Sequence, residues 1–275
     1  MKVITVGTSV ITRTLISSFR REGVEVSACV GRNAEKNEAF CRENGVSRHY
    51  ESYQLALEKE DAQFVYIALP NNLHYSYAKE ALESGKNVIL EKPFTASFQQ
   101  AQQLRDIALS RHLYLFEAMV SVHLPVYEDI RNHLDDLGTI RHVQMSMTKY
   151  SSKYDDYLAG KETSAFDPSC AGGALMDLNV YNLNVLVYLF SLPKSADYFA
   201  HVENGVDIGG SVVARYDGFV AVASSYKNCD AENYFDIAGE KGHFFHHGLT
   251  SIPDQYTRNI RQKKKGEGYG RPDQS

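Results

Sequence analysis

A short apolar run in the first half of the chain ends in two charged residues and a proline. Residues 87–93 have the sequence NVILEKP, so the apolar residues 88–90 are followed directly by Glu91, Lys92 and Pro93. The run is typical of a strand that is buried on both faces. Because ligands bind outside the carboxyl ends of strands in open parallel sheets, a lysine there can meet a cofactor and a substrate together. The alternative is a surface ion pair beside a turn, since short motifs also occur by chance.

A second pair of polar residues lies in a predicted helix of the second half. This helix opens with Gly172 and Gly173 and continues through Asp177 and Tyr181. Residues four apart share one face of a helix, so Asp177 and Tyr181 are expected to lie together. If they are buried among the neighbouring apolar residues, they need hydrogen-bond partners; the alternative is a tyrosine whose hydroxyl reaches the rim of a core. The two glycines would let the backbone approach another surface closely.

The turn after the first predicted strand is a candidate phosphate site. A full dinucleotide fingerprint has three glycines, but here only Gly7 is present and Ser9 and Thr12 stand at the other two places. Both are small, so the backbone can still approach a phosphate at the helix N-terminus. An ordinary βα turn is the alternative. The residues predicted to contact the cofactor here are Gly7, Thr8, Ser9, Val10 and Ile11.

The end of the second predicted strand indicates which dinucleotide binds. An acidic residue there would bind the adenosine ribose diol, but this chain has Gly31-Arg32-Asn33. A guanidinium at that place can hold a 2′-phosphate through two hydrogen bonds. We therefore predict NADP(H) as the cofactor, with NAD(H) as the second choice; the alternative for Arg32 is a side chain that faces solvent.

Polar residues also follow the third predicted strand. Leu69, Pro70, Asn71 and His74 stand where a nicotinamide pocket would be lined, together with Glu91 after the fourth strand. The same residues are equally ordinary as the start of a helix.

The predicted elements of the first 120 residues alternate between strand and helix. Strands are expected at residues 2–6, 24–30, 64–69, 88–90 and 113–116. Helices are expected at residues 13–21, 34–44, 53–60, 73–84 and 97–110. This alternation indicates βαβ units and a parallel sheet, and right-handed crossovers then give a doubly wound α/β fold. We predict a dinucleotide-binding Rossmann domain over residues 1–120.

The second half of the chain has a different pattern. Strand-like runs lie at residues 140–150, 196–203, 209–216, 219–226, 234–238 and 243–246, and one helix is expected at about residues 171–189. Asp217-Gly218 between two alternating runs is a strong hairpin signal. Many strands with few helices indicate an antiparallel sheet, hence an α+β domain over residues 121–257. Residues 258–275 have little apolar surface to bury, so we predict a disordered tail there.

Composition excludes several classes of protein. The 275 residues are 43% hydrophobic and 23% charged with a formal net charge of −5, which gives no general attraction to nucleic acid or to an anionic membrane. No apolar stretch approaches the about 20 residues of a membrane span, and the first predicted strand starts too near Met1 to leave room for a signal peptide.

Cysteines and histidines add two expectations. The four cysteines are scattered without a CxxC pair, which fits free thiols in a reducing cytoplasm. We predict no metal site: along a strand His243 and His247 would share one face and His246 the other, and no carboxylate is adjacent in the motif.

Several of these motifs occur in the order seen in a known family. Over roughly residues 1–247 the chain resembles the Gfo/Idh/MocA oxidoreductases. The motifs that carry the resemblance are Gly7-Thr8-Ser9, Pro70-Asn71-Asn72-Leu73-His74, Glu91-Lys92-Pro93, Glu117-Ala118-Met119 with Pro125, and Gly172-Gly173-Ala174-Leu175-Met176-Asp177 with Tyr181. Many members have His where this chain has Tyr181, so it looks most similar to the branch of dihydrodiol dehydrogenases and NADP-dependent xylose dehydrogenases.

The resemblance implies a Rossmann domain, an open-faced and mainly antiparallel second sheet, and a homodimer formed through that sheet. It also implies an active-site lysine and helix residues that match Asp177 and Tyr181. The chain departs from the family pattern in its reduced glycine fingerprint. It also ends early, because members usually continue for several dozen residues beyond the turn that matches Glu240-Lys241-Gly242.

These observations predict an NAD(P)-dependent oxidoreductase that moves a hydride between nicotinamide and a carbonyl/alcohol carbon of a sugar, cyclic polyol or dihydrodiol. Tyr181 is expected to be the general acid/base. Lys92 would lower the phenol pKa, ordinarily about 10, and hydrogen-bond the substrate oxygen. Asp177 would orient Lys92 or the sugar hydroxyls. The alternative is a non-catalytic sensor that binds a nucleotide or sugar and regulates a partner, which the weakened glycine turn favours.

Overall fold

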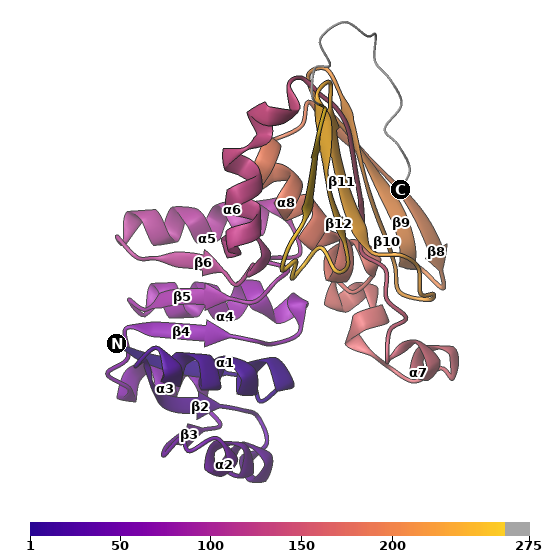
Figure 1. Ribbon diagram of the computed structural model, residues 1–275. Coiled ribbons are helices and arrows are strands. Elements are labelled where there is room, and N and C mark those ends of the chain that lie inside the picture. Colours follow the sequence, from indigo (N-terminus) through magenta and orange to yellow (C-terminus); the bar gives the residue numbers. More distant parts are fainter. Residues whose placement is uncertain (262–275) are drawn as a thin grey trace, which may run out of the picture.

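The computed structural model describes residues 1–261 and contains two β-sheets with their helices (Figure 1). The N-terminal half of the chain forms the first sheet and the C-terminal half forms the second. This arrangement confirms the predicted fold class, a doubly wound parallel domain followed by an α+β domain with a mainly antiparallel sheet. No helix among these residues is long and apolar enough to cross a membrane.

The first sheet has six parallel strands in the order β3-β2-β1-β4-β5-β6. The strands are β1 Lys2–Val6, β2 Glu25–Val30, β3 His49–Tyr50, β4 Phe64–Ile67, β5 Asn87–Leu90 and β6 Leu115–Glu117. The helices are α1 Val10–Arg21, α2 Ala34–Glu43, α3 Tyr53–Lys59, α4 Asn71–Glu83 and α5 Phe98–Ser110. The strand order reverses between β1 and β4, and ligands bind at such a switch point.

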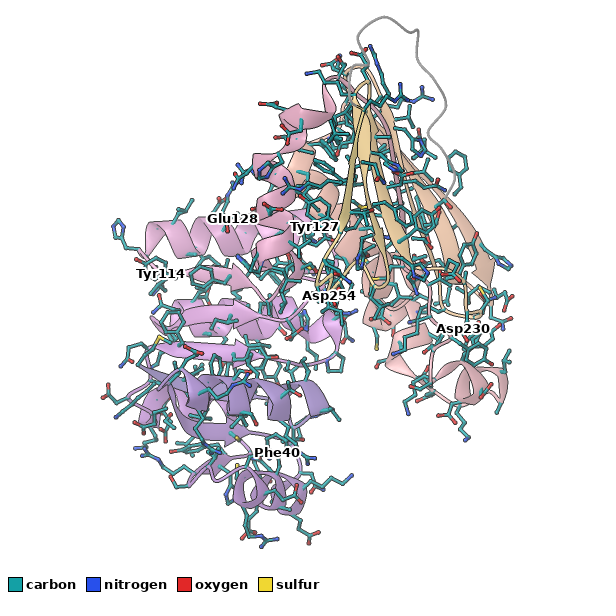
Figure 2. The ribbon with its side chains drawn as sticks, viewed as in Figure 1. Phe40, Tyr114, Tyr127, Glu128, Asp230 and Asp254 are labelled. Atoms are coloured by element: carbon teal, nitrogen blue, oxygen red, sulfur yellow. The ribbon has the colours of Figure 1, made fainter. Side chains whose placement is uncertain are left out.

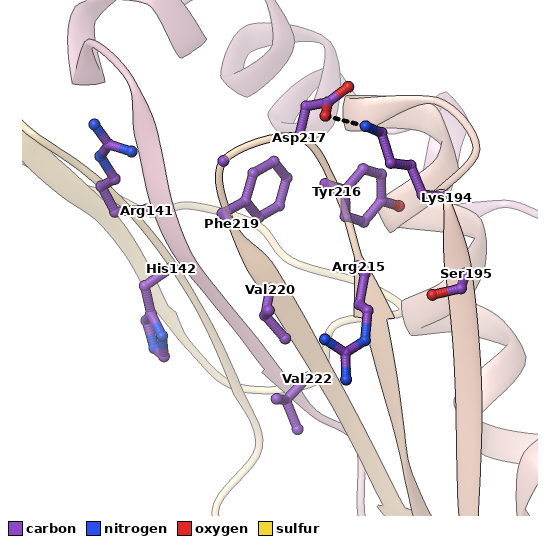
Figure 3. A pocket seen from close by; sticks show the side chains of 11 residues that line it. Arg141, His142, Lys194, Ser195, Arg215, Tyr216, Asp217, Phe219, Val220 and Val222 are labelled. Atoms are coloured by element: carbon purple, nitrogen blue, oxygen red, sulfur yellow. Dashed lines mark ion pairs between the residues drawn. The ribbon is translucent and has the colours of Figure 1, made fainter.

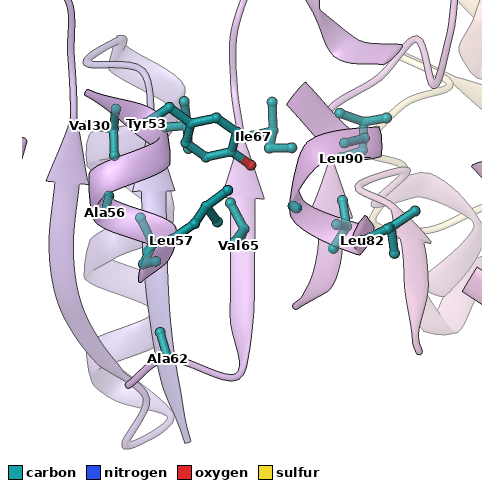
Figure 4. Packing of buried hydrophobic residues seen from close by; sticks show 14 of the residues in the cluster. Val30, Tyr53, Ala56, Leu57, Ala62, Val65, Ile67, Leu82 and Leu90 are labelled. Carbon is teal, nitrogen blue, oxygen red and sulfur yellow. The ribbon is translucent and has the colours of Figure 1, made fainter. Parts of the chain in front are cut away.

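Helices pack on both faces of this sheet, which explains the almost continuous apolar strands. On one face, Val65, Ile67 and Leu90 pack with side chains from α3 and α4 (Figure 4). On the other face, Ile16 of α1 packs against Cys29 of β2. Because apolar packing holds each βα unit on the sheet, the loops at the carboxyl ends of the strands have defined positions.

A side-chain cap decides where α1 begins. The predicted start was Arg13, but the helix starts at Val10 because Ser9 accepts a hydrogen bond from the backbone N–H of Thr12 at 3.4 Å. Val10 and Ile11 are 79% and 49% exposed. No amphipathic pattern therefore marks the first turn of this helix in the sequence.

The second sheet has seven strands in the order β13-β12-β11-β7-β10-β9-β8. The strands are β7 Ile140–Ser146, β8 Ser195–Glu203, β9 Val206–Arg215, β10 Val220–Tyr226, β11 Tyr234–Gly239, β12 Gly242–His247 and β13 Thr257–Ile260. Only β7 and β10 pair in parallel, and the other neighbours are antiparallel. The hairpin predicted at Asp217-Gly218 joins β9 to β10.

Two helices pack on one face of the second sheet. They are α6 Pro125–Asn132, which was not predicted, and α8 Val180–Phe190. Tyr127 of α6, which is labelled in Figure 2, is fully buried. Its hydroxyl donates to the backbone carbonyl of Thr250 at 2.6 Å. Val185 and Leu186 of α8 lie in the same cluster as Phe235 of β11. Among residues 1–261 no helix packs on the opposite face, so this sheet has one covered and one open side (Figure 1).

Short elements account for most differences from the predicted boundaries. Several elements are too short to show a periodic pattern in the sequence. They are β3, α7 Tyr154–Leu158, and the 3-10 turns Ser121–His123, Leu134–Leu137, Ser164–Phe166 and Pro168–Cys170. The helix predicted over residues 171–189 is in fact a π-helical turn, Leu175–Asn179, followed by α8.

The predicted C-terminal tail starts too early. Its first residues belong to β13, which pairs with β12, and Arg258 forms an ion pair with Asp129 of α6. Tyr256 also donates to Asp129 Oδ2 at 2.8 Å. All four residues of β13 are exposed, so the strand is held by backbone pairing and has no alternating apolar pattern to reveal it. The rest of the predicted tail, residues 262–275, lies outside the described residues.

Deleting β13 measures what it adds to stability. A chain that ends at Tyr256 should melt a few degrees below one that ends at Arg261, because β12 loses its backbone partner and Asp129 loses Arg258. An exposed ion pair contributes about 0–1 kcal/mol, and 1 kcal/mol moves the melting temperature by about 2–4 °C at this size. Thermal melts followed by circular dichroism make the comparison. Identical melting temperatures would mean that the strand contributes nothing.

Candidate active site

Lys92 and Asp177 come from different domains and meet at one point. The Lys92 Nζ atom donates to Asp177 Oδ1 and to the Asp177 backbone carbonyl, both at 2.9 Å. Lys92 follows β5 of the first sheet, whereas Asp177 lies in the helical segment on the second. Tyr181 completes the group, since the Lys92 Nζ atom is 4.9 Å from the centroid of its ring. The structure therefore brings together the three residues that the sequence predicted as catalytic.

The backbone before Asp177 runs against a neighbouring strand. Gly173 has φ +119°, and a Cβ there would lie 1.8 Å from Asp207 Oδ1 on β9. Asp207 in turn accepts a hydrogen bond from the backbone N–H of Leu175 at 2.7 Å, at the start of the π turn. At Gly172 a Cβ would lie 2.6 Å from the Ser164 carbonyl oxygen. The close approach predicted for these two glycines is confirmed, and it sets where Asp177 enters the site.

Carboxylates hold the segment that carries Lys92. Glu91 accepts from the Tyr66 hydroxyl at 2.6 Å, and Glu117 accepts from the backbone N–H of Phe94 at 3.0 Å. Burial raises the pKa of Glu117, and the hydrogen bond from Phe94 opposes that shift. Both contacts join neighbouring strands of the first sheet, so the loop after β5 is tied to β4 on one side and to β6 on the other.

His74 lies beneath the site and not on its surface. It is fully buried, and its two ring nitrogens face the Pro93 carbonyl at 2.8 Å and the Leu69 carbonyl at 2.9 Å. The sequence placed His74 among the cofactor contacts. Because both nitrogens are engaged and no surface is exposed, its side chain instead connects the loops after β4 and β5, a role that depends on burial the sequence could not show.

Lys227 was missed by the sequence analysis. It follows β10, is 1% exposed, and its Nζ atom lies 3.0 Å from Asp177 Oδ2. The same atom donates to the Ala165 carbonyl at 2.7 Å and lies 4.3 Å from the centroid of the Phe166 ring. A single lysine after a strand usually extends into solvent, so nothing in the sequence marks this one as buried beside Asp177.

The charges of the cluster support one another. Burial raises the pKa of Asp177, but the Lys92 and Lys227 ammonium groups outweigh it and leave that pKa lowered. Burial lowers the pKa of Lys92, but Asp177 and Tyr181 outweigh it and leave that pKa raised. These opposite shifts keep Lys92 and Asp177 as an ion pair at neutral pH, with the Lys227 Nζ atom on the other oxygen of the carboxylate.

The expected lowering of the Tyr181 pKa is wrong. Burial raises the pKa of Tyr181, and the nearby Lys92 ammonium opposes that shift without reversing it. The removal of a phenolate from water costs more than the attraction of one ammonium returns. Tyr181 is therefore a protonated phenol near neutral pH.

The turn after β1 has the shape of a nucleotide site despite its missing glycines. Gly7 has φ +102°, and a Cβ there would lie 2.2 Å from the Ala68 carbonyl oxygen, so only glycine fits. Ser9 caps α1, and the neighbouring Thr8 is exposed. Exposed Val10 and Ile11 lie on the first turn of α1. A helix N-terminus next to exposed residues, with an apolar surface beside it, fits a dinucleotide.

The other predicted cofactor residues follow neighbouring strands. Arg32 follows β2 and is exposed, and Leu69, Pro70 and Asn71 follow β4. Asn71 also donates to the Ala171 carbonyl at 2.9 Å, which joins this loop to the second domain. Since β2, β1, β4 and β5 are adjacent in the sheet, all these residues lie along one edge with Lys92.

The histidines near β12 have separate partners. His246 Nδ1 lies 2.7 Å from the Gln255 carbonyl, His247 pairs with Glu232, and His243 lies 3.3 Å from Asp236. Within residues 1–261, no group of three or more His, Cys, Asp or Glu residues is arranged to hold a metal ion.

Comparison with known families agrees with this geometry. A model described as "Oxidoreductase family, NAD-binding Rossmann fold" matches residues 1–119, and a model of the GFO/IDH/MocA C-terminal domain matches residues 129–245. The chain belongs to the GFO/IDH/MocA oxidoreductase family, as its motifs indicated. It is an NAD(P)-dependent oxidoreductase, and this membership favours the enzymatic interpretation over the sensor.

Two curated relatives and one solved structure show the range of similarity. The chain is 34% identical over 240 residues to the scyllo-inositol 2-dehydrogenase (NADP(+)) of Bacillus subtilis (strain 168), covering 86% of this chain and 73% of the relative. It is 29% identical over 225 residues to the trans-1,2-dihydrobenzene-1,2-diol dehydrogenase of Xenopus tropicalis, covering 79% and 66%. A 3-ketoreductase from Actinomadura kijaniata, crystallised with NADP and TDP-benzene, superposes with a TM-score of 0.82 at 23% identity, covering 94% of this chain and 84% of that one.

Proposed function

We propose that this protein transfers a hydride between NADP(H) and a carbonyl/alcohol carbon of a small sugar, cyclic polyol or dihydrodiol. The observation that carries the proposal is the cluster of Lys92, Asp177 and Tyr181 at the same sheet edge as the nucleotide turn. The relatives named for inositol and dihydrodiol dehydrogenation support the substrate class. We assign nucleotide binding to a domain of residues 1–120 and substrate binding to a domain of residues 121–257.

The nicotinamide dinucleotide, when bound, supplies or accepts the hydride. The residues proposed to hold it follow β1, β2, β4 and β5, and they are Gly7, Thr8, Ser9, Val10, Ile11, Arg32, Leu69, Pro70, Asn71, Glu91 and Lys92. His74 supports this surface from below. Gly7 and the capped start of α1 are the features of the chain that fit the phosphates.

The proton is handled by Tyr181. Because its pKa is raised, the hydroxyl is protonated near neutral pH and can donate to a substrate carbonyl oxygen during reduction. Oxidation of an alcohol needs the phenolate, so the oxidation rate should rise with pH while the reduction rate falls once the phenol ionises. Lys92 donates to the same substrate oxygen and stabilises its developing negative charge. Asp177 holds the Lys92 ammonium in place.

A substrate panel tests the activity directly. Sugars, cyclic polyols and dihydrodiols are offered with NADP⁺ and with NAD⁺, and the nicotinamide absorbance is followed. Turnover with at least one class supports the proposal. Nucleotide binding without turnover on any of them would contradict it and favour the sensor.

Substitution of the proposed catalytic groups should separate chemistry from binding. Lys92→Met and Tyr181→Phe should each lower kcat on the order of 10² or more, because both act on the substrate oxygen. NADP(H) affinity should change little. In Lys92→Met, Asp177 keeps Lys227 as a partner, so folding should survive.

Steady-state kinetics and nucleotide titrations measure these two effects. Matched controls are Lys86→Met, whose Nζ atom donates to the Glu60 carbonyl at 3.0 Å, and Tyr114→Phe, whose side chain is 65% exposed. Near-normal turnover in Lys92→Met or Tyr181→Phe would show that the substituted residue does not have the proposed catalytic role.

Arg32 is proposed to select NADP(H) over NAD(H). A charge-assisted hydrogen bond contributes about 1.5–3 kcal/mol to binding. Arg32→Ala should therefore reduce the ratio of the NAD(H) to the NADP(H) dissociation constant by roughly tenfold or more. The preference is measured from the dissociation constants of the two cofactors. Arg105→Ala, at an exposed position on α5, serves as the control. Equal affinities of the unmodified protein for NADP(H) and NAD(H) would contradict the proposal.

We also propose a homodimer formed by the open side of the second sheet. This outer face carries the side chains that alternate away from α8, including Phe199, Ser211, Val213, Val222, Ser224 and Tyr234. Phe199 is 65% exposed, and a hollow of about 700 Å³ at one end of the face is lined by Val220, Val222 and Arg215, with the Lys194–Asp217 ion pair at its rim (Figure 3). Exposed apolar residues with a charged rim are typical of interfaces.

The dimer is tested by light scattering after size exclusion. The unmodified protein should have twice the monomer mass, and Phe199→Asp or Val213→Lys should lower it to one copy. Leu109→Asp on α5 is the matched control, because Leu109 is equally exposed at 67%. A monomeric unmodified protein contradicts the proposal.

We propose that the protein functions in the reducing cytoplasm. All four cysteines are free thiols, two of them buried in the first domain at Cys29 and Cys41. Free cysteines are the rule in reducing compartments.

A further inference from the structure

Lys227 is a lysine in the protein interior, where lysine side chains are rare. Its side chain is 1% exposed and is among the largest fully buried side chains of the described residues. A lysine is seldom buried unless it is paired. Here the Nζ atom has the Asp177 carboxylate at 3.0 Å, the Ala165 carbonyl at 2.7 Å and the face of Phe166 at 4.3 Å. The ammonium therefore contacts a carboxylate, a carbonyl and an aromatic ring, and the carboxylate is that of Asp177, a proposed catalytic residue.

The two lysines divide the Asp177 carboxylate between them. Oδ1 is 2.9 Å from Lys92 Nζ and Oδ2 is 3.0 Å from Lys227 Nζ. With only Lys92 present, the carboxylate could rotate about its last bond and break its contact with Lys92, leaving the ammonium held by the Asp177 backbone carbonyl alone. With both oxygens held, the carboxylate has one orientation, and so does the Lys92 ammonium.

We propose that Lys227 is a positioning residue of the reaction: it fixes the Asp177 carboxylate so that Lys92 points at the substrate oxygen. This inference rests on the proposed function, because it concerns the same site. Lys227 itself is 1% exposed, because Asp177, the Ala165 carbonyl and the Phe166 ring cover its Nζ atom.

A purely structural role is a weaker explanation. An apolar side chain would fill a buried space without the cost of removing an ammonium from water, and buried ion pairs are often no more stable than such replacements. The titratable groups around Asp177 are Lys92 from the end of β5, with Glu91 beside it in the chain, Lys227 from the end of β10, and Tyr181 from α8. Asp207 of β9 lies behind Gly173. Of these only the two lysines favour the carboxylate, so loss of Lys227 should raise the pKa of Asp177.

Two substitutions test the inference on the full chain. Lys227→Met removes the charge at similar length, and Lys227→Gln also keeps a donor for the Ala165 carbonyl in case the first variant folds poorly. Both should lower kcat by about tenfold or more, since small misplacements of reacting groups are costly, and leave NADP(H) affinity unchanged. The acid limb of the pH profile of kcat/KM should move to higher pH. Lys86→Met should do none of this.

A second measurement does not need activity. The Asp177 carboxyl is titrated by NMR in protein labelled at the aspartate side-chain carbon, with its signal assigned by its loss in Asp177→Asn. A midpoint at higher pH in the Lys227 variants supports the inference. An unmoved midpoint together with an unmoved acid limb would overturn it while leaving the proposed function intact. If the unmodified protein turns over no substrate, the proposed function fails and this titration alone decides whether Lys227 controls Asp177.

Discussion

Asp177 is the charge on which the geometry of this molecule depends. It accepts from Lys92, which follows a strand of the first sheet, and from Lys227, which follows a strand of the second. A carboxylate is expensive to remove from water unless cations stay close to it. Of these two contacts, the one with Lys92 also joins the two domains at the point where cofactor and substrate are proposed to meet.

Backbone contacts set this arrangement as firmly as charges do. Gly173 lies so close to Asp207 that a Cβ would overlap it, and a Cβ at Gly7 would likewise overlap the Ala68 carbonyl oxygen. The first contact places the start of the helix that carries Asp177 and Tyr181, and the second places the turn at the start of α1. Neither glycine is needed for flexibility. Each is needed because another backbone or side chain occupies the space beside it.

Burial separates the proposed acid from the permanent charges. Tyr181 lies against Lys92, yet its pKa is raised, whereas the pKa of Asp177 is lowered by two ammonium groups. Groups with opposite shifts in one site can hold opposite protonation states at the same pH. A neutral phenol beside a fixed ammonium is suited to deliver a proton to an oxygen that is becoming negative, which is the requirement of carbonyl reduction.

Local sequence determined the fold class and the candidate catalytic residues, and tertiary contacts decided how those residues behave. Apolar strands followed directly by Gly7, Gly31 and Glu91 predicted the doubly wound sheet, because period and turn residues are local properties. The spacing of Asp177 and Tyr181 likewise placed them together. By contrast, the burial of Lys227, the occupied nitrogens of His74, the strand β13 and the raised pKa of Tyr181 depend on residues that packing brings in from other parts of the chain, up to 129 positions away. Desolvation and pairing are set by whatever packs around a group, and a linear pattern carries no record of those neighbours.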